Sequence, residues 1–264
     1  MDHHLDARDE QLLAQDPYTF ATMRRILREP CDLVLTDHRH LILCHSAQPY
    51  PVWLWTPDGL SAEDMRRAWE LAAQVRPLHS GFRYNIKHDL AECFIAAAQA
   101  QGDALKIATQ LYAYDCPAPI APEDPVQGQL HVCTEADLEE VADLLRRFHD
   151  DISMNPMDTS RSLAKATEHI QDRGFFLWKV DGETVSCCSR RRNGDMATIA
   201  SVYTLPAFRR RHYAQQLVYQ VTRMIVDQGL TPMLYADADY EASNACYVKI
   251  GYVLRGRLCT IAQA

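Results

Sequence analysis

The sequence predicts an α/β (α+β) protein with a mixed central sheet flanked by helices, preceded by a smaller α/β domain that has a similar order of elements. Three observations support this prediction. Helical and strand periodicities alternate along most of the chain. A proline-rich stretch divides the chain into two halves, and 264 residues suit one large or two small domains at about 150 residues each. Apolar residues make up 47% and charged residues 23%, as in an ordinary folded protein.

The proline-rich stretch covers residues 116–129 and holds four of the 13 prolines. Because proline lacks a backbone N–H, this stretch has no continuous ladder of hydrogen-bond donors. We therefore predict an N-terminal domain over 1–118, a linker over 119–129 and a C-terminal domain over 130–264. Each of the two domains is long enough to bury its own core.

The C-terminal half carries local signals for its helices and turns. Thr134 and Asp137 have the spacing of a capping box, and Asp181-Gly182 between two β-prone runs is a hairpin signal. The periodicity predicts helices over 135–150, 160–172, 214–229 and 243–250, and strands over 175–180, 184–190, 196–204, 233–236 and 252–261. With a first strand before these elements, the predicted order is β-α-α-β-β-β-α-β-α-β.

The N-terminal half repeats the later part of that order. The patterns predict strands over 32–36, 41–45, 52–56, 82–87 and 105–114, and helices over 62–75 and 89–101. The resulting order, β-β-β-α-β-α-β, makes an internal duplication a hypothesis, since residue-level similarity between the halves is not obvious.

The loop over 205–214 is the most unusual segment of the chain. It contains Arg209, Arg210 and Arg211 between a predicted strand and a predicted helix. Cations are disfavoured at the positive end of a helix dipole by about 0.3–1 kcal/mol each. A bound anion would remove this cost, and phosphate at a strand-to-helix turn is the natural candidate. The alternative is a solvated basic turn.

Two segments resemble motifs of the GNAT N-acetyltransferases. Val202-Tyr-Thr-Leu-Pro-Ala-Phe-Arg-Arg-Arg-His-Tyr-Ala214 resembles motif A, which ends in Arg/Gln-x-x-Gly-x-Gly/Ala, and Ser243-Asn-Ala-Cys-Tyr247-Val-Lys-Ile-Gly-Tyr252 is similar to motif B. The resemblance covers about 130–262, where it implies a GNAT fold. The N-terminal half lacks an Arg-x-x-Gly-x-Gly/Ala loop, so it is a candidate for a degenerate GNAT-like module without a second coenzyme site.

The resemblance also implies roles for individual residues. The end of the third strand of this half, around Ser201, would present backbone groups to the pantetheine and the oxyanion, and Tyr247 would be the general acid for the thiolate. The resemblance implies a coenzyme-binding set of Val202, Tyr203, Thr204, Arg209, Arg210, Arg211, His212, Tyr213, Ala214 and Asn244. Packing on the sheet is the alternative for Tyr247, and a helix N-cap is the alternative for Asn244.

Two positions depart from the motifs. His212 replaces the central glycine of motif A, where a Cβ and an imidazole can crowd the approach of phosphate. Tyr240 stands where motif B usually opens with Asn. The general base is not assigned by spacing, and the candidates by residue type are His149, Asp195, Asp237, Asp239 and Glu241.

These features predict an acetyl-CoA-dependent N-acetyltransferase that acts on a small amine, as a monomer or homodimer. The alternative is a catalytically inactive GNAT scaffold that binds coenzyme A or regulates. A net charge of −8 argues against nucleic acid, and no apolar run suits a membrane span. We expect a cytoplasmic protein without a metal site, in which the nine scattered cysteines mostly fill the core. The His and Cys residues between Asp37 and His45 lack a second cluster of metal-ligand spacing.

Overall fold

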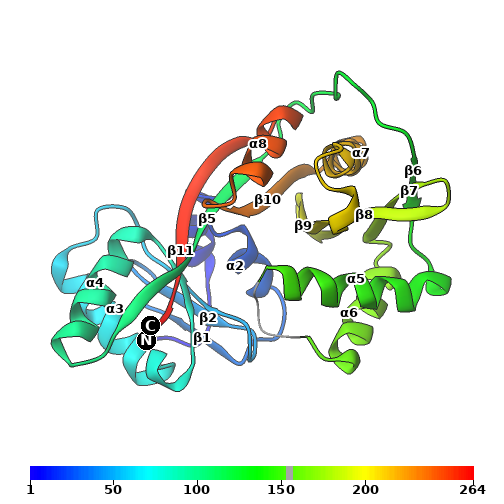
Figure 1. The fold of residues 1–264 in the computed structure, drawn as a ribbon. Coiled ribbons are helices and arrows are strands. Elements are labelled where there is room, and N and C mark those ends of the chain that lie inside the picture. Colours follow the sequence, from blue (N-terminus) through cyan, green and yellow to red (C-terminus); the bar gives the residue numbers. More distant parts are fainter. Residues whose placement is uncertain (153–156) are drawn as a thin grey trace. The chain divides into compact units, whose positions relative to one another are not determined.

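The computed structural model describes residues 1–152 and 157–264, and it divides the chain into two compact α/β units (Figure 1). The first unit contains residues 1–113, 236–240 and 254–264, and the second contains residues 114–235 and 241–253. Both units consist of a sheet with helices packed on it. The predicted fold class is confirmed.

The first unit is built on six strands in the order β1-β2-β3-β4-β11-β5. Neighbours β1, β2 and β3 are antiparallel, β3 and β4 are parallel, and β11 is antiparallel to β4. The strands are β1 (Leu33–Thr36), β2 (Ile42–His45), β3 (Val52–Trp55), β4 (Tyr84–Ile86), β5 (Leu105–Asp115) and β11 (Val253–Gln263). The helices are α1 (Ala7–Ala14), α2 (Ala21–Ile26), α3 (Ala62–Val75), η1 (Leu78–Ser80) and α4 (His88–Ala100).

Helices α3 and α4 cover one face of this sheet. Helix α3 has the predicted bounds because Ser61 caps its first turn and its apolar positions recur at helical spacing. Trp69 from α3 meets the ring of Phe94 from α4 at 5.2 Å in an edge-to-face contact. On the opposite face, Trp53 contacts Phe20, which precedes α2, with ring centroids 6.3 Å apart. Each sheet face therefore has its own helical cover.

The sequence analysis missed α1 and α2. Asp6 and Asp9 form a capping box at the start of α1, so a local signal was present. Helices of eight and six residues offer too few turns for apolar periodicity to stand out. Packing on the rest of the unit stabilises them, as it does most short helices.

The second unit places five strands in the order β10-β9-β8-β7-β6. The pairs β6–β7, β7–β8 and β8–β9 are antiparallel, and β9–β10 is parallel. The strands are β6 (Gln129–Val132), β7 (Phe175–Val180), β8 (Glu183–Asn193), β9 (Met196–Thr204) and β10 (Thr231–Asp237). The helices are η2 (Glu135–Asp137), α5 (Leu138–Asp151), α6 (Thr159–Gln171), η3 (Pro206–Phe208), α7 (Tyr213–Asp227) and α8 (Glu241–Ile250). The predicted order of elements is confirmed.

Helices α5 and α6 lie on one face of strands β7–β9, and α7 lies on the other (Figure 1). The strongly amphipathic α5 buries Val141, Leu144 and Leu145 against the sheet. Alternation along the strands sends Leu177 and Cys187 to this same core. The sandwich fixes the end of β9 and the start of α7, where the candidate site lies.

The division into units differs from the single boundary predicted at residues 119–129. Residues 116–128 contain neither helix nor strand, but β11 belongs to the first unit, where Cys259 pairs with Ile86 of β4. Conversely, residues from Tyr114 onward belong to the second unit, where the N–H of Cys116 donates to the carbonyl of Pro232 at 3.0 Å. Most of β11, the last strand of the C-terminal half, thus belongs to the first unit, and the end of β5, the last strand of the N-terminal half, belongs to the second. Such non-local pairing satisfies backbone groups beside β4 and β10, and local periodicity does not encode it.

The two halves also agree in how their strands pair. Strands β1–β2–β3 and β7–β8–β9 are both antiparallel triplets, and each triplet continues through a helix into a parallel strand. This agreement is consistent with the hypothesis of duplication, which stays a prediction.

Candidate functional site

The loop between β9 and α7 has an unusual backbone. Arg210 and His212 both have φ of 62°, in the left-handed region, and His212 (ψ 10°) is the residue that precedes the first turn of α7. A non-glycine residue in this region costs about 1–2 kcal/mol. His212 therefore adopts a conformation that glycine enters without steric cost, and its side chain is exposed.

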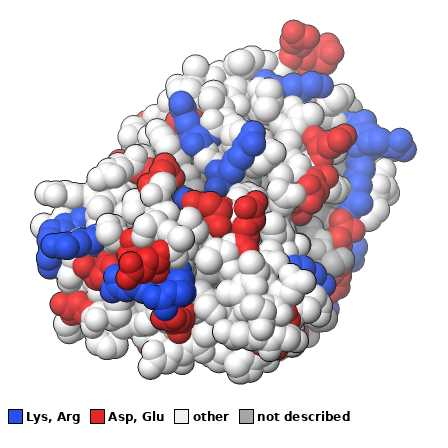
Figure 2. Space-filling view, turned by 90° about the vertical axis from the view of Figure 1, so that its left-hand side faces the viewer, with Lys and Arg blue, Asp and Glu red and all other residues white. Residues whose placement is uncertain are grey.

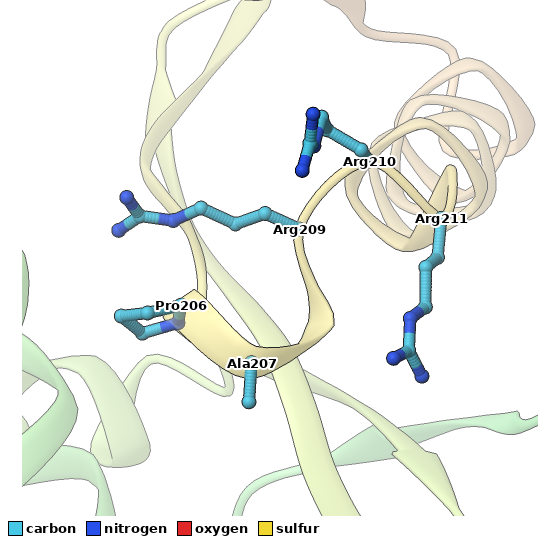
Figure 3. Close-up of a pocket in the computed structure, with 5 residues that line it drawn as sticks. All are labelled: Pro206, Ala207, Arg209, Arg210 and Arg211. Carbon is cyan, nitrogen blue, oxygen red and sulfur yellow. The ribbon is translucent and has the colours of Figure 1, made fainter.

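The start of α7 carries uncompensated positive charge. No side chain of the described residues caps it, and its first turn contains no acidic residue. Its N–H groups point out of the helix with the positive end of the dipole. A depression of about 640 Å³ beside it is lined by Pro206, Ala207, Arg209, Arg210 and Arg211 (Figure 3). These features together favour an anion.

The three arginines play different parts, and their side chains leave the loop in different directions (Figure 3). Arg209 donates from Nε to the carbonyl of Thr204 at 3.1 Å and from Nη2 to a carboxylate oxygen of Asp151 at 2.7 Å. Among the residues that the structure describes, Arg210 and Arg211 form no ion pair. Arg209 therefore ties the loop to the end of α5, whereas the other two guanidinium groups remain available.

Aromatic rings contact the arginines of this loop and the start of α7. The guanidinium of Arg209 lies 5.7 Å from the ring of Tyr203, and that of Arg211 lies 5.7 Å from the ring of Phe208. Phe208 in turn meets Tyr213, the first residue of α7, edge to face at 6.5 Å. Ala214, the second residue of α7, is half-buried, so Tyr213 and Ala214 fix the helix start that carries the N–H groups.

The C-terminal part of β9 contains a break in its ladder. Ser201 has φ of 50°, and the pairing of β8 with β9 shifts register between Cys187 and Ser189. Such a bulge leaves backbone groups without ladder partners, and here it falls on Ser201 and half-buried Val202. Beyond the bulge, Ser186 Oγ donates to the carbonyl of Tyr203 at 2.8 Å. It also lies 3.1 Å from Thr204 Oγ1.

Helix α8 carries the two residues predicted from motif B. Asn244 is the fourth residue of α8, so it is not an N-cap, and its Oδ1 accepts a hydrogen bond from the hydroxyl of Tyr114 at 2.9 Å. Tyr247 is 7% exposed and packs edge to face on Tyr252. Burial raises the pKa of Tyr247 above its usual range, with smaller contributions from the thiols of Cys246 and Cys188. The phenol is therefore protonated at neutral pH.

The candidate bases lie in different places. Asp195 is in the turn between β8 and β9, at the opposite end of β9 from the loop. His149 packs beside α6, and burial, together with Lys165 and Arg161, lowers its pKa to about 4. Asp237 ends β10 and its Oδ1 accepts the N–H of Asp239, and Glu241 is the first residue of α8.

Sequence reasoning missed two residues of this region. Asp151, which holds Arg209, lies 58 positions away from it, so no local spacing connects the two. Gln216 in the first turns of α7 is 6% exposed, and its Oε1 has no hydrogen-bond partner within the described residues. A glutamine inside an otherwise apolar stripe was the available signal.

Comparisons with known proteins show which folds and which family model the chain resembles. Residues 177–260 match the family model described as FR47-like protein, and no curated protein matches the sequence. A GCN5-related N-acetyltransferase from Sphaerobacter thermophilus is 15% identical, with TM-score 0.65 over 97% of this chain and 93% of its own. One from Kribbella flavida is 14% identical, with TM-score 0.60 over 93% of each chain. A GNAT-family acetyltransferase from Colwellia psychrerythraea is 10% identical, with TM-score 0.59 over 98% of each chain.

Surface charge and hydropathy complete the description. On the face in Figure 2, the basic and acidic side chains of described residues lie interspersed. Within the part of the chain that is described, no helix has the length and apolar character to cross a bilayer. The chain therefore has the fold of the GNAT-family acetyltransferase structures, and its residues 177–260 match the FR47-like family model.

Proposed function

We propose that the second unit is an acetyl-CoA-dependent N-acetyltransferase that transfers an acetyl group to the amine of a small molecule. The turn from β9 to α7 carries this proposal. An uncapped helix start and a left-handed backbone at His212 follow this turn, and the depression beside it is lined by Arg210 and Arg211, which form no ion pair with the described residues. Among common metabolic ligands, a pyrophosphate has the charge and the acceptor oxygens that such a turn selects.

Coenzyme A would bind through its phosphates. Arg210 and Arg211 would donate forked hydrogen bonds to phosphate oxygens, and the N–H groups at the start of α7 would add to them. Arg209 would act as a positioning residue, because its bonds to Asp151 and Thr204, which use two of its five N–H donors, hold its guanidinium against α5 and β9. Asn244 would likewise act through the position of α8, since it holds Tyr114.

The transfer itself needs a stabilised oxyanion and two proton movements. The nitrogen lone pair of the amine attacks the thioester carbon, the C–S bond breaks, and the thiolate takes a proton from the hydroxyl of Tyr247. The proton that the amine loses passes to a base or to water, and the Tyr247 phenolate takes up a proton from solvent before the next turnover. Backbone N–H groups freed by the bulge at Ser201 and Val202 would stabilise the oxyanion, and such a donor is typically worth about 3–4 kcal/mol.

The first unit would complete the fold without binding coenzyme. Its corresponding turn, Thr56 to Ala62, contains no basic residue. The acceptor pocket is predicted to involve residues 150–173 and 238–243, of which 153–156 lie outside the described residues. The identity of the amine follows from the pocket and not from the fold.

Thermal unfolding with acetyl-CoA tests the proposal first. Ligand at about 100 times its dissociation constant adds about 2.7 kcal/mol of stability, which raises Tm by roughly 5–10 °C for a chain of this size. Coenzyme A without its 3′-phosphate serves as the comparison ligand. An unchanged Tm at millimolar acetyl-CoA would overturn the proposal.

A screen of primary amines for thiol release then tests catalysis. Release of free coenzyme A that depends on one amine supports transfer. Binding without release across a broad amine panel would instead assign the chain to the catalytically inactive GNAT scaffolds.

A further inference from the structure

Three side chains with different donor atoms meet where β6 passes into η2. His131 and Cys133 are two positions apart on an extended segment, so they project to the same side. Asp137 is the last residue of η2. The imidazole nitrogen, the thiol sulfur and a carboxylate oxygen lie within 4.8 Å of one another, and His131 Nε2 is 2.9 Å from Asp137 Oδ2.

The thiol of Cys133 is buried without a hydrogen-bond partner. Cys133 is 3% exposed, and its sulfur forms no hydrogen bond with any described residue. Three other buried thiols donate to backbone carbonyls: Cys116 to Ile250, Cys187 to Ser201 and Cys259 to Ile86. Cys44 and Cys188 are buried thiols that, like Cys133, form no hydrogen bond with described residues. Cys133 is the one that has an imidazole nitrogen and a carboxylate oxygen within 4.8 Å in the described part of the chain.

The carboxylate of Asp137 is already oriented by the backbone. Its Oδ2 accepts from the N–H of Thr134 at 2.8 Å and from the Thr134 hydroxyl at 3.1 Å. This capping box explains why an acid stands at position 137. It requires neither His131 nor Cys133, so the convergence of all three side chains is a separate feature.

Although the sequence led us to expect no metal site, we propose that His131, Cys133 and Asp137 bind a zinc ion. Sulfur, imidazole nitrogen and carboxylate oxygen are the ligands that Zn²⁺ takes in proteins, and a soft thiolate disfavours Mg²⁺ and Ca²⁺. Binding releases the thiol proton to solvent, so the ion is neutralised by the Cys133 thiolate and the Asp137 carboxylate, with His131 neutral. The fourth position is left to water.

The surroundings suit entry and retention of the ion. The side chain of His131 is 36% exposed, whereas that of Asp137 is 13% exposed, so the cluster opens to solvent on the His131 side. Thr134 supplies the outer hydrogen bonds that hold a ligating carboxylate in place. The bound ion would join the edge strand β6 to the start of α5. It would thereby order the segment that follows the irregular residues 116–128.

Cobalt substitution of the full-length, tag-free chain tests this site directly. We expect one equivalent of Co²⁺ to produce thiolate-to-cobalt charge-transfer absorption, and Zn²⁺ to remove that absorption by competition. Cys133→Ser should abolish the band, and His131→Gln should weaken Zn²⁺ binding by more than the roughly 10–100-fold that loss of an outer-shell residue causes. The control variant Cys93→Ser changes a half-buried cysteine on α4 of the first unit. It should leave the absorption band unchanged.

Folding and function are separated from metal binding in this design. Far-UV circular dichroism of Cys133→Ser without metal checks that this variant folds. If it does not fold, His131→Gln serves as the test variant in its place, because the His131 side chain is more accessible to solvent. Absence of a thiolate band at one equivalent of Co²⁺, or its persistence in Cys133→Ser, would overturn the proposal. Neither readout involves acetyl-CoA, so the site is tested independently of the proposed acetyl transfer.

Discussion

The two units enter a helix from a parallel strand in opposite ways. In the first unit, the turn from β3 ends at Ser61, whose side chain accepts the N–H of Asp64, and Glu63 and Asp64 place negative charge in the first turn of α3. In the second unit, the turn from β9 ends at His212, no side chain caps α7, and three arginines precede it. The turn before α3 satisfies N–H groups and compensates the dipole of its helix with side chains of its own. The turn before α7 does neither with its own side chains, which is why we propose that an anion binds there.

Helix α4 of the first unit and helix α8 of the second unit also differ at one corresponding position. The seventh residue of α4 is Phe94, which is fully buried, and the seventh residue of α8 is Tyr247, which is buried apart from 7% of its surface. Both positions carry an aromatic ring on the sheet side, but only Tyr247 has a proton to give. The two units thus share a similar order of elements but differ at this position, where a ring without an ionisable group stands in one and a phenol stands in the other.

Tyr247→Phe makes this position of the second unit resemble the first, and it should have the largest effect. We expect turnover with an accepted amine to fall by about 10²–10⁴-fold, the usual contribution of a positioned general acid. Coenzyme binding should stay nearly unchanged, because the phosphates bind elsewhere. Steady-state kinetics together with the acetyl-CoA thermal shift measure the two effects, and unchanged turnover would remove Tyr247 from the mechanism.

Arg210→Ala combined with Arg211→Ala should remove most of the affinity for coenzyme A. Hydrogen bonds to charged groups contribute about 1.5–3 kcal/mol each, so the dissociation constant should rise by at least about 100-fold in isothermal titration. The matched control is Arg66→Ala with Arg67→Ala, a pair of exposed arginines on α3. Equal loss of affinity in the control would mean that general charge, rather than the turn, attracts the coenzyme.

His212→Val tests the left-handed backbone at the start of α7. A β-branched residue tolerates φ of 62° poorly, so we expect the free energy of unfolding to fall by about 1–2 kcal/mol. His212→Gly should be at least as stable as the natural protein, since glycine adopts this conformation without steric cost. Urea denaturation compares the three proteins. A more stable valine variant than glycine variant would show that the turn does not hold this conformation.

His38 and His149 should give the two units opposite responses to pH, and this is the smallest effect. Desolvation lowers the pKa of His38, but hydrogen bonds to Asp9 and Asp2 outweigh it, and the net pKa is raised. Its stabilisation is therefore full below about pH 6.5 and is lost as the pH rises through the folded-state pKa. For His149, whose pKa is lowered to about 4, stability is lost as the pH falls from about 6.5 toward 4, because only the unfolded state takes up the proton.

The urea concentrations at the midpoint of unfolding, measured across this pH range, test both predicted directions of the change in stability. His38→Gln should remove the decline on the alkaline side, and His149→Gln should flatten the decline on the acid side. A His38→Gln protein that keeps the alkaline decline would place its origin in another group.

Local sequence patterns predicted most of the elements because each has its own signal. The helix over 62–75 was predicted to the residue, since Ser61 marks its start and an apolar stripe runs its length. The same patterns did not place β11 with β4, because strand pairing over this separation depends on which sheet positions lack a partner. Helices α1 and α2 were too short for periodicity.

For the site, the sequence by itself determined the chemistry of the turn: three arginines, a histidine in place of glycine, and a tyrosine on the following motif. These are residue types at fixed spacings, which a linear pattern records. Only the tertiary structure decided which of these side chains have hydrogen-bond partners within the protein and which backbone conformation the turn takes. Asp151 and Thr204 each accept a hydrogen bond from Arg209, and the backbone at His212 takes the left-handed form. The reason is that hydrogen-bond partners and backbone angles are set by the packing of α5, β9 and α7, which lie apart in sequence and meet only in the folded unit.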